Sequence, residues 1–221
     1  MMRRSRWRLF FCAVAGPFAL TACGAAGGTA DAAEGGLSVA AERLCGGTAV
    51  SARAGDALEA ITGAALFAAS GEKATVEAAA RELVRMGAST AVGNGDICRI
   101  QAPAGSRVGE IRVTWEMYAA APGGARGERF TPLPMGERAG AATDGAFVAF
   151  ACAGGDLPGD ADRHLRVVVQ KGGMPAVPQG DERQLKDAWA TVAHSFALAL
   201  ARDLGCAGDG ELPAEPSLSP A

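Results

Sequence analysis

Four cysteines, Cys45, Cys98, Cys152 and Cys206, divide most of this chain of 221 residues into blocks of nearly equal length. They stand 53, 54 and 54 residues apart. A structural zinc site is expected to contain close pairs such as C-x-x-C, and these spacings offer none. An even number of cysteines instead predicts two disulfides, provided that the chain folds in an oxidising compartment. Two such links restrict the fold more than any other feature of the sequence.

The first 22 residues have the character of an export signal. Four arginines among the first eight residues precede an apolar run from Leu9 to Leu20, which is typical of a secretory signal peptide. Twelve residues rise only about 18 Å as a helix, too short for a hydrocarbon core of about 30 Å. We therefore expect residues 1–22 to direct export and not to remain as a membrane-spanning helix.

The leader ends in the sequence Leu20-Thr21-Ala22-Cys23. This stretch resembles the lipobox of bacterial lipoprotein signal peptides. The resemblance implies that a diacylglyceryl group is attached to the sulfur of Cys23 and that the chain is cut just before it. The alternative is a plain secretory signal with a chance cysteine. We prefer the lipobox, and expect the mature protein to be lipid-anchored at the cell membrane, on its extracellular face.

The charge of the remaining chain restricts its partners. The leader holds four of the 21 Lys and Arg residues and none of the 24 Asp and Glu residues, so the mature chain has a formal net charge of −7. Nucleic-acid affinity depends on Lys and Arg neutralising phosphates, so we expect no nucleic-acid partner. An acidic body also gives no polybasic attraction to anionic lipids, which leaves the lipid on Cys23 as the membrane anchor.

The two disulfides can be paired in three ways once Cys12 is removed with the leader and Cys23 carries lipid. The sequence does not exclude any of the three. We favour Cys45–Cys98 together with Cys152–Cys206, because each pair closes one local block. The chain-entropy model assigns roughly 4 kcal/mol to a loop of that size.

Composition divides the mature chain into three parts. Residues 23–36 contain no large apolar residue and predict a flexible tether with a reach of about 20 Å. Residues 207–221 are rich in Pro, Gly and Ser, so we expect a disordered tail. The segment between them, residues 37–206, has the size of a single domain with one core.

Hydrophobic periodicity predicts the elements of that domain. We expect short helices at 56–61, ended by Gly63, and at 73–86, capped by Ser70 and ended by Gly87. Strands are expected at 97–100, 111–118, 146–152 and 164–170, and the alternation in 111–118 indicates an antiparallel strand with one wet face. The segment from Pro122 to Gly145 predicts a long mobile loop.

The strongest element is a helix over residues 181–204. Its apolar residues recur at helical spacing within an arc of about 80°, which predicts a stripe packed on the sheet; they are Leu185, Trp189, Val192, Phe196 and Leu200. Helices and strands are segregated along the chain, so we predict an α+β fold. Its antiparallel sheet, of about four strands, packs against this long C-terminal helix and the two N-terminal helices.

The two histidines give little indication of catalysis. His194 is about 180° from the apolar stripe, so we expect it to face water, with Ser195 directed elsewhere. His164 follows an acidic stretch and could share a side with Asp160 and Asp162. A metal site there would need further ligands, so we prefer a solvated acidic loop. The sequence thus predicts no metal site and no cofactor.

One short motif deserves comparison with a catalytic one. Ser70 and Lys73 in "SGEK" resemble the S-x-x-K of serine β-lactamases and penicillin-binding proteins, and "KGG" at 171–173 is similar to their K-T-G. However, no S-D-N equivalent lies between them, Gly172 replaces the motif's Thr, and the domain is too small for that fold. We therefore expect Ser70 to cap a helix and Lys73 to be solvated, and we expect no catalytic residues.

The layout "LCGG", helix, "ITG", helix, "CRI" extends over residues 43–101. It is similar to the first half of an uncharacterised actinobacterial lipoprotein family, the DUF3558 group, in which one cysteine precedes the helices and another begins the first strand. That family has no assigned activity, so the resemblance implies no functional residues.

Three classes of function remain. The first is an extracytoplasmic binding or sensing module for a small molecule or an envelope protein. The second is an envelope scaffold or assembly partner, and the third is a small hydrolase. We prefer the binding module, and expect the protein not to be an enzyme.

Overall fold

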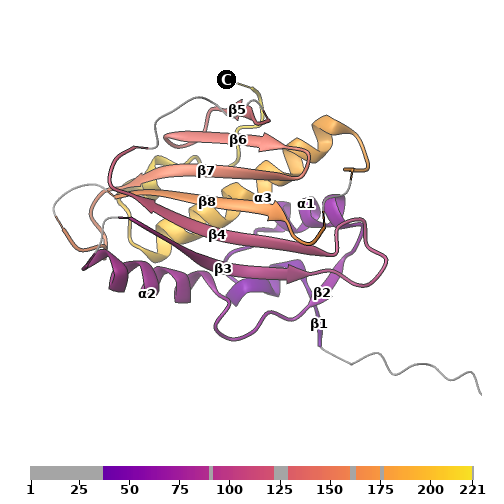
Figure 1. Ribbon diagram of the computed structural model, residues 1–221, viewed down its shortest axis with the longest axis horizontal. Helices are drawn as coiled ribbons and strands as arrows, with labels where there is room; N and C mark the ends of the chain where they lie inside the picture. The colour runs from indigo at the N-terminus through magenta and orange to yellow at the C-terminus, as the bar shows by residue number, and fades with distance from the viewer. Residues whose placement is uncertain (1–36, 90–91, 122–128, 160–162, 175–176, 221) are drawn as a thin grey trace, which may run out of the picture. The chain divides into compact units, whose positions relative to one another are not determined.

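A six-stranded antiparallel sheet forms the centre of the fold (Figure 1). The computed structural model describes residues 37–89, 92–121, 129–159, 163–174 and 177–220. The strands follow the order β3-β4-β8-β7-β6-β5 across the sheet. Their bounds are β3 (Gly93–Gln101), β4 (Glu110–Tyr118), β5 (Thr131–Leu133), β6 (Arg138–Ala142), β7 (Gly145–Cys152) and β8 (Arg163–Lys171). The predicted α+β class with an antiparallel sheet is confirmed, but the sheet has six strands and not about four.

The two additional strands lie in the segment from Pro122 to Gly145, which we had expected to be a mobile loop. In its described part, β5 pairs with β6, and β6 pairs with β7 through a turn at Thr143 and Asp144. The sequence of β6, "RAGAA", consists mainly of residues with low β propensity. β6 is a strand because it pairs with β7 and packs over α3. The local sequence of β6 indicates neither contact.

The alternation predicted for β4 is present in the structure. Ile111, Val113, Trp115 and Met117 are buried, while the residues between them are partly exposed. Behind this buried face lie α1 (Ala52–Thr62) and α3 (Glu182–Asp203), as Figure 1 shows. The sheet therefore packs its apolar face on helices and presents its other face outward.

The long helix α3 is buried more completely than its periodicity predicts. All five residues of the predicted stripe are buried, and Asp181 caps the helix by accepting a hydrogen bond from the backbone N–H of Gln184. The opposite side is also covered, because α1 and the C-terminal segment pack on it. The expectation that His194 faces water is therefore wrong, since only 3% of its surface is exposed.

The first N-terminal helix begins earlier than predicted, and the second has a different cap from the predicted one. Helix α1 starts after Ser51, whose hydroxyl accepts from the Ala54 N–H, and ends at Gly63 as expected. Helix α2 (Val76–Gly87) is capped by Thr75 and not by Ser70. A small antiparallel pair, β1 (Ser38–Ala40) and β2 (Leu66–Ala68), lies beside η1 (Ala41–Gly46).

Both favoured disulfides are confirmed. Cys45–Cys98 joins η1 to β3, and Cys152–Cys206 joins the end of β7 to the segment that follows α3. One bond therefore links η1 to the large sheet, and the other links the segment after α3 to the same sheet. The two loops have almost the same length, 53 and 54 residues.

The C-terminal segment differs from the disordered tail that its composition predicts. Residues 207–211 form η2 (Ala207–Glu211), and the segment then continues along the domain to residue 220. Leu212 is buried and Leu218 packs against the core. These two leucines within a Pro-, Gly- and Ser-rich stretch attach the segment to the domain. Among the described residues, no helix combines the length and the apolar character needed to cross a membrane.

Candidate functional site: the open face of the sheet

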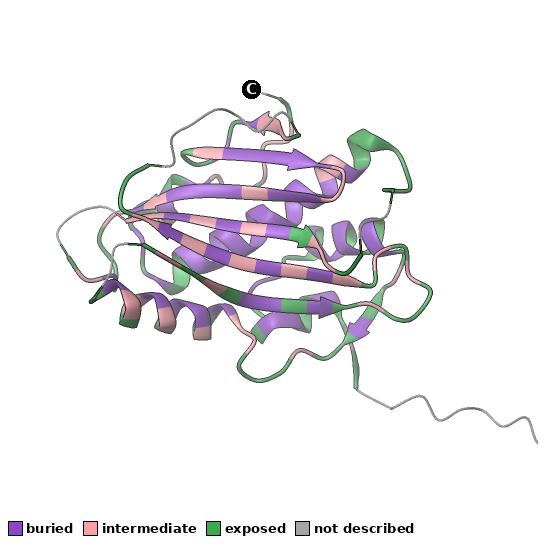
Figure 2. Ribbon diagram, in the orientation of Figure 1, coloured by how far each residue is buried: buried purple, intermediate pink, exposed green. Residues whose placement is uncertain are grey.

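The face of the sheet opposite α1 and α3 is a candidate binding surface. None of the described helices crosses it (Figure 1), and its central strands alternate between buried and partly exposed residues (Figure 2). We call it the open face. The residues that define it are Thr114, Glu116 and Tyr118 on β4, His164, Arg166, Val168 and Gln170 on β8, Phe147 and Ala149 on β7, and Arg138 and Gly140 on β6.

A hydrogen-bonded charged group occupies the β4–β8 side of the open face. Glu116 and Arg166 are register partners, and the Nε of Arg166 donates to Oε2 of Glu116 at 2.6 Å. The hydroxyl of Tyr118 donates to the same oxygen. The Arg166 guanidinium also lies 5.3 Å from the centroid of the Tyr118 ring. Burial, followed by the hydrogen bond to Glu116, raises the pKa of Tyr118 to about 12.

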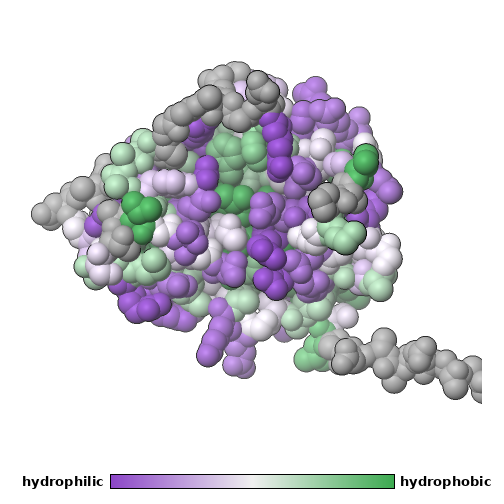
Figure 3. Space-filling view, viewed as in Figure 1, coloured by the Kyte–Doolittle hydropathy of each residue, from purple (hydrophilic) through white to green (hydrophobic). Residues whose placement is uncertain are grey.

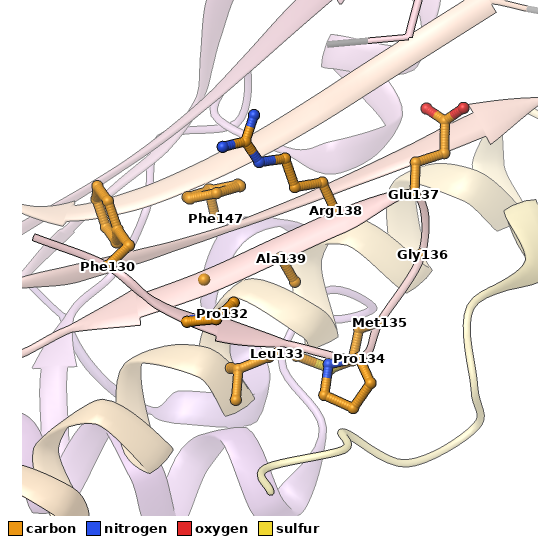
Figure 4. A pocket seen from close by; sticks show the side chains of 11 residues that line it. Phe130, Pro132, Leu133, Pro134, Met135, Gly136, Glu137, Arg138, Ala139 and Phe147 are labelled. Carbon is orange, nitrogen blue, oxygen red and sulfur yellow. The ribbon is translucent and has the colours of Figure 1, made fainter. Parts of the chain in front are cut away.

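A pocket of about 220 Å³ opens on the β5–β7 side of the same face (Figure 4). Phe130 and Phe147 meet edge to face with ring centroids 5.2 Å apart and form one wall. The segment from Pro132 to Met135 forms the other wall. Figure 3 shows hydrophobic surface gathered on this face beside hydrophilic groups, so the pocket joins an apolar area to a charged one.

The absence of a side chain at Gly140 gives the two aromatic rings their positions. A Cβ built on Gly140 would lie 3.0 Å from Cβ of Phe130 and 3.0 Å from Cε1 of Phe147. That is closer than Cβ atoms ordinarily approach, so a larger residue would displace the rings. Glycine thus allows both rings to lie directly over β6.

Arg138 is placed at the rim of this pocket by β6 (Figure 4). Its register partner on β7 is Ala149, whose other partner is Arg166 on β8. The two arginines therefore lie on either side of one small side chain. Arg166 is paired with Glu116, whereas the guanidinium of Arg138 has no hydrogen bond or ion pair among the described residues.

The sequence-predicted candidates lie apart from this pocket, with one exception. His164 is on the open face, and its Nδ1 lies 2.9 Å from Oε1 of Glu137, a pocket residue. Asp160 and Asp162, the proposed companions of His164, lie outside the described residues, as does Cys23. In the part of the chain that the structure describes, no group of three His, Cys, Asp or Glu side chains could hold a metal ion.

Ser70 and Lys171 have structural contacts and do not meet. The Ser70 hydroxyl accepts from the Cys45 N–H at 3.2 Å and lies 3.6 Å from the sulfur of Cys98. It therefore packs on a disulfide and does not cap a helix as we had expected. The amine of Lys171 donates to the carbonyl oxygen of Met174.

The serine that follows His194 is also held by the backbone. Its hydroxyl donates to the carbonyl oxygen of Ala49 at 2.8 Å and accepts from the Ser51 N–H at 3.0 Å. His194 itself contacts the carbonyl oxygen of Pro213. As expected, His194 and Ser195 do not form a nucleophile and base pair.

Sequence reasoning missed the pocket because its residues fall in the segment taken for a loop. Phe130 and Arg138 have no periodic partner nearby in the sequence, and their neighbours come from β7. The one local signal is an aromatic residue, Phe130, in a segment otherwise rich in Gly, Ala, Pro and Arg. Comparison with known proteins adds nothing further: no family model, curated protein or solved structure matches this chain.

Proposed function

We propose that this chain is an extracytoplasmic lipoprotein, anchored through Cys23, that binds a small molecule on its open face. The observation that carries the proposal is the pocket of about 220 Å³ between Phe130, Phe147 and the segment 132–135. Ligand sites are concave, largely apolar, and supplied with a few polar groups that orient the ligand. Most of the residues that line the pocket are apolar, and Arg138 and Glu137 supply polar groups beside them.

The lipid anchor in this proposal rests on the sequence alone. The lipobox resemblance at 20–23 and the tether at 23–36 would hold the domain within about 20 Å of the membrane surface. The confirmed disulfides support export, because such bonds persist in oxidising compartments.

An envelope assembly partner is the second candidate. Met174 and Val177, on the connection between β8 and α3, are 85% and 87% exposed. Large apolar side chains this exposed favour contact with another protein when they form one patch. The two residues belong to one short connection, on a different part of the domain from the pocket.

In-cell photo-crosslinking separates these candidates. A photoreactive amino acid replaces Val168 on the open face, Val177 on the β8–α3 connection, or Glu77 on α2 as a control, in the full-length protein. We expect a small-molecule adduct, measured as added mass on the intact protein, from the Val168 position and not from the Glu77 position. Capture confined to Val177, with a protein attached, would replace the binding module by the assembly partner.

A further inference from the structure

We propose that the pocket of the open face binds the carboxylate of a small apolar acid, and that the guanidinium of Arg138 holds this carboxylate. The inference rests on the proposed function and deepens it, because it assigns the chemical class of the ligand. The structural relationship that carries it is a half-buried arginine without an acceptor at the rim of an aromatic pocket.

Three other arginines near the open face already have carboxylate partners. Arg166 pairs with Glu116, Arg112 with Glu110 at 3.4 Å, and Arg129 with Asp144 at 3.1 Å. Arg138 differs from them, since its guanidinium has no acceptor among the described residues. A partly buried donor group is more stable when it is hydrogen-bonded. In a chain with more acidic than basic residues, a cation left without a carboxylate is suited to an acceptor supplied by a ligand.

The acid among the pocket residues, Glu137, is engaged elsewhere. Both of its carboxylate oxygens lie 2.9 Å from Nδ1 of His164. Figure 4 shows the Glu137 carboxylate and the Arg138 guanidinium standing apart, with the guanidinium on the side of Phe147. The donor fork of Arg138 therefore remains available to an incoming anion.

Ala149 separates Arg138 from Arg166 on the open face. It is paired with Arg138 on one side and Arg166 on the other, and adjacent strands are about 4.8 Å apart. Ala149 is itself fully buried, so the space for the anion is the pocket beside Arg138. An arginine fork binds a carboxylate through two parallel hydrogen bonds, so a planar monoanion fits here. Because Arg166 is already neutralised by Glu116, one negative charge matches the site better than two.

The apolar wall and the volume define the remainder of the ligand. The edge-to-face pair of Phe130 and Phe147, together with Pro132 and Met135, offers contacts for a ring or a branched aliphatic group. A cavity of about 150 Å³ accommodates benzene, so 220 Å³ has room for one ring and a carboxylate.

A four-way binding comparison tests this assignment. Full-length protein in lipid nanodiscs is titrated with 3-phenylpropionate and with 3-phenylpropanol, its uncharged analogue, by isothermal titration calorimetry. The wild type and Arg138→Gln are compared. We expect the wild type to bind the acid at least about tenfold more tightly than the alcohol, and Arg138→Gln to remove this difference while binding of the alcohol is unchanged.

Three further variants test whether the effect of Arg138→Gln comes from the lost guanidinium. Arg138→Lys retains the charge and should recover part of the preference for the acid. Arg99→Gln removes an arginine on β3 that pairs with Glu110, and should leave both affinities unchanged. Phe147→Leu should weaken the acid and the alcohol by similar factors. Melting temperature and the absence of free thiols establish that each variant is folded.

The outcomes separate this inference from the proposed function. If the alcohol binds the wild type as tightly as the acid, or if Arg138→Gln weakens both equally, the carboxylate assignment is overturned while a binding pocket remains. If neither probe binds at millimolar concentration, the assignment is also overturned. The crosslinking at Val168 then decides independently whether the open face binds any small molecule.

Discussion

The Nε2 of His194 lies 2.7 Å from the carbonyl oxygen of Pro213 and donates a hydrogen bond to it. This bond connects the middle of α3 to the C-terminal segment. The carbonyl can only accept, so the buried imidazole must carry its proton on Nε2. Burial lowers the pKa of His194, and the bond to Pro213 only partly opposes that effect. The native fold therefore favours the neutral imidazole.

The first prediction follows from this lowered pKa. In the unfolded chain His194 takes up a proton near its ordinary pKa of 6.5, whereas the folded protein resists protonation until the pH is lower. Between those two pH values the unfolded state binds more protons, so the free energy of unfolding falls as the pH decreases below about 7. Urea denaturation at a series of pH values from 8 to 5 measures this slope.

His194→Gln is the matched variant for this prediction. Its side-chain amide keeps an N–H donor for Pro213 but does not titrate. The difference in unfolding free energy between wild type and variant should diminish or reverse as the pH falls through 6.5. A difference that stays constant from pH 8 to pH 5 would show that the imidazole titrates equally in the folded and unfolded states.

Tyr118 is the single tyrosine of the chain, which makes its ionisation directly observable. Burial and the hydrogen bond to Glu116 raise its pKa to about 12, and Arg166 acts in the opposite direction. Absorbance of the phenolate near 295 nm should therefore rise with a midpoint about two units above the ordinary value of 10. Since the folded-state pKa is raised, its stabilising contribution is complete below pH 10 and is lost as the pH rises through about 12.

Glu116→Gln provides the control for the tyrosine titration. It removes the carboxylate that accepts from the phenol but leaves the ring on β4. The midpoint should move down toward 10 in the variant, and also in wild type unfolded by urea. A wild-type midpoint near 10 in the folded protein would contradict the hydrogen bond between Tyr118 and Glu116.

The sequence predicted the elements whose signals are local. The alternating residues from Ile111 to Tyr118 and the apolar stripe from Leu185 to Leu200 both contribute buried faces. An element buried on one side has apolar residues at regular intervals in its sequence, so such faces can be predicted. His194 was misplaced because α3 is covered on both sides, and a stripe identifies only the more apolar side. Strand β6 was missed because alanine and glycine carry no strand signal.

The candidate site was less accessible to sequence reasoning than the fold. Arg138, Ala149 and Arg166 form a row only because β6, β7 and β8 are in register. Pairing of strands separated by many residues depends on the whole sheet, and no local pattern specifies it. The disulfide pairing was one of three that the sequence left open, and the structure contains the one that we favoured.

Gly154 and Gly155 have similar backbone angles but differ in the space available for a side chain, so their alanine variants can be compared. Both have positive φ, 74° and 67°. A Cβ on Gly155 would lie 2.2 Å from the carbonyl oxygen of Leu204, whereas one on Gly154 meets no atom within 4 Å. Gly154→Ala should cost about 1 kcal/mol, from the left-handed conformation alone. Gly155→Ala should cost about 3 kcal/mol or more, because the backbone beside the Cys152–Cys206 disulfide must also move.

Thermal unfolding distinguishes the two glycine variants. For a domain of this size about 1 kcal/mol corresponds to a change in Tm of roughly 3 °C. We expect Gly155→Ala to lower Tm about three times as much as Gly154→Ala. Equal decreases would mean that the segment from 153 to 156 does not approach the end of α3 as closely as the structure shows.

The final prediction concerns Cys23, which lies outside the described residues. If the stretch Leu20 to Cys23 is a lipobox, its thiol is the acceptor of the diacylglyceryl group and cleavage depends on that modification. Cys23→Ala should therefore abolish incorporation of labelled fatty acid and leave the precursor unprocessed at this site. Cys12→Ala, which removes a thiol inside the leader, should leave labelling and processing unchanged. Continued labelling of the Cys23→Ala protein would refute the anchor, and the open face would then have to be considered as part of a secreted domain.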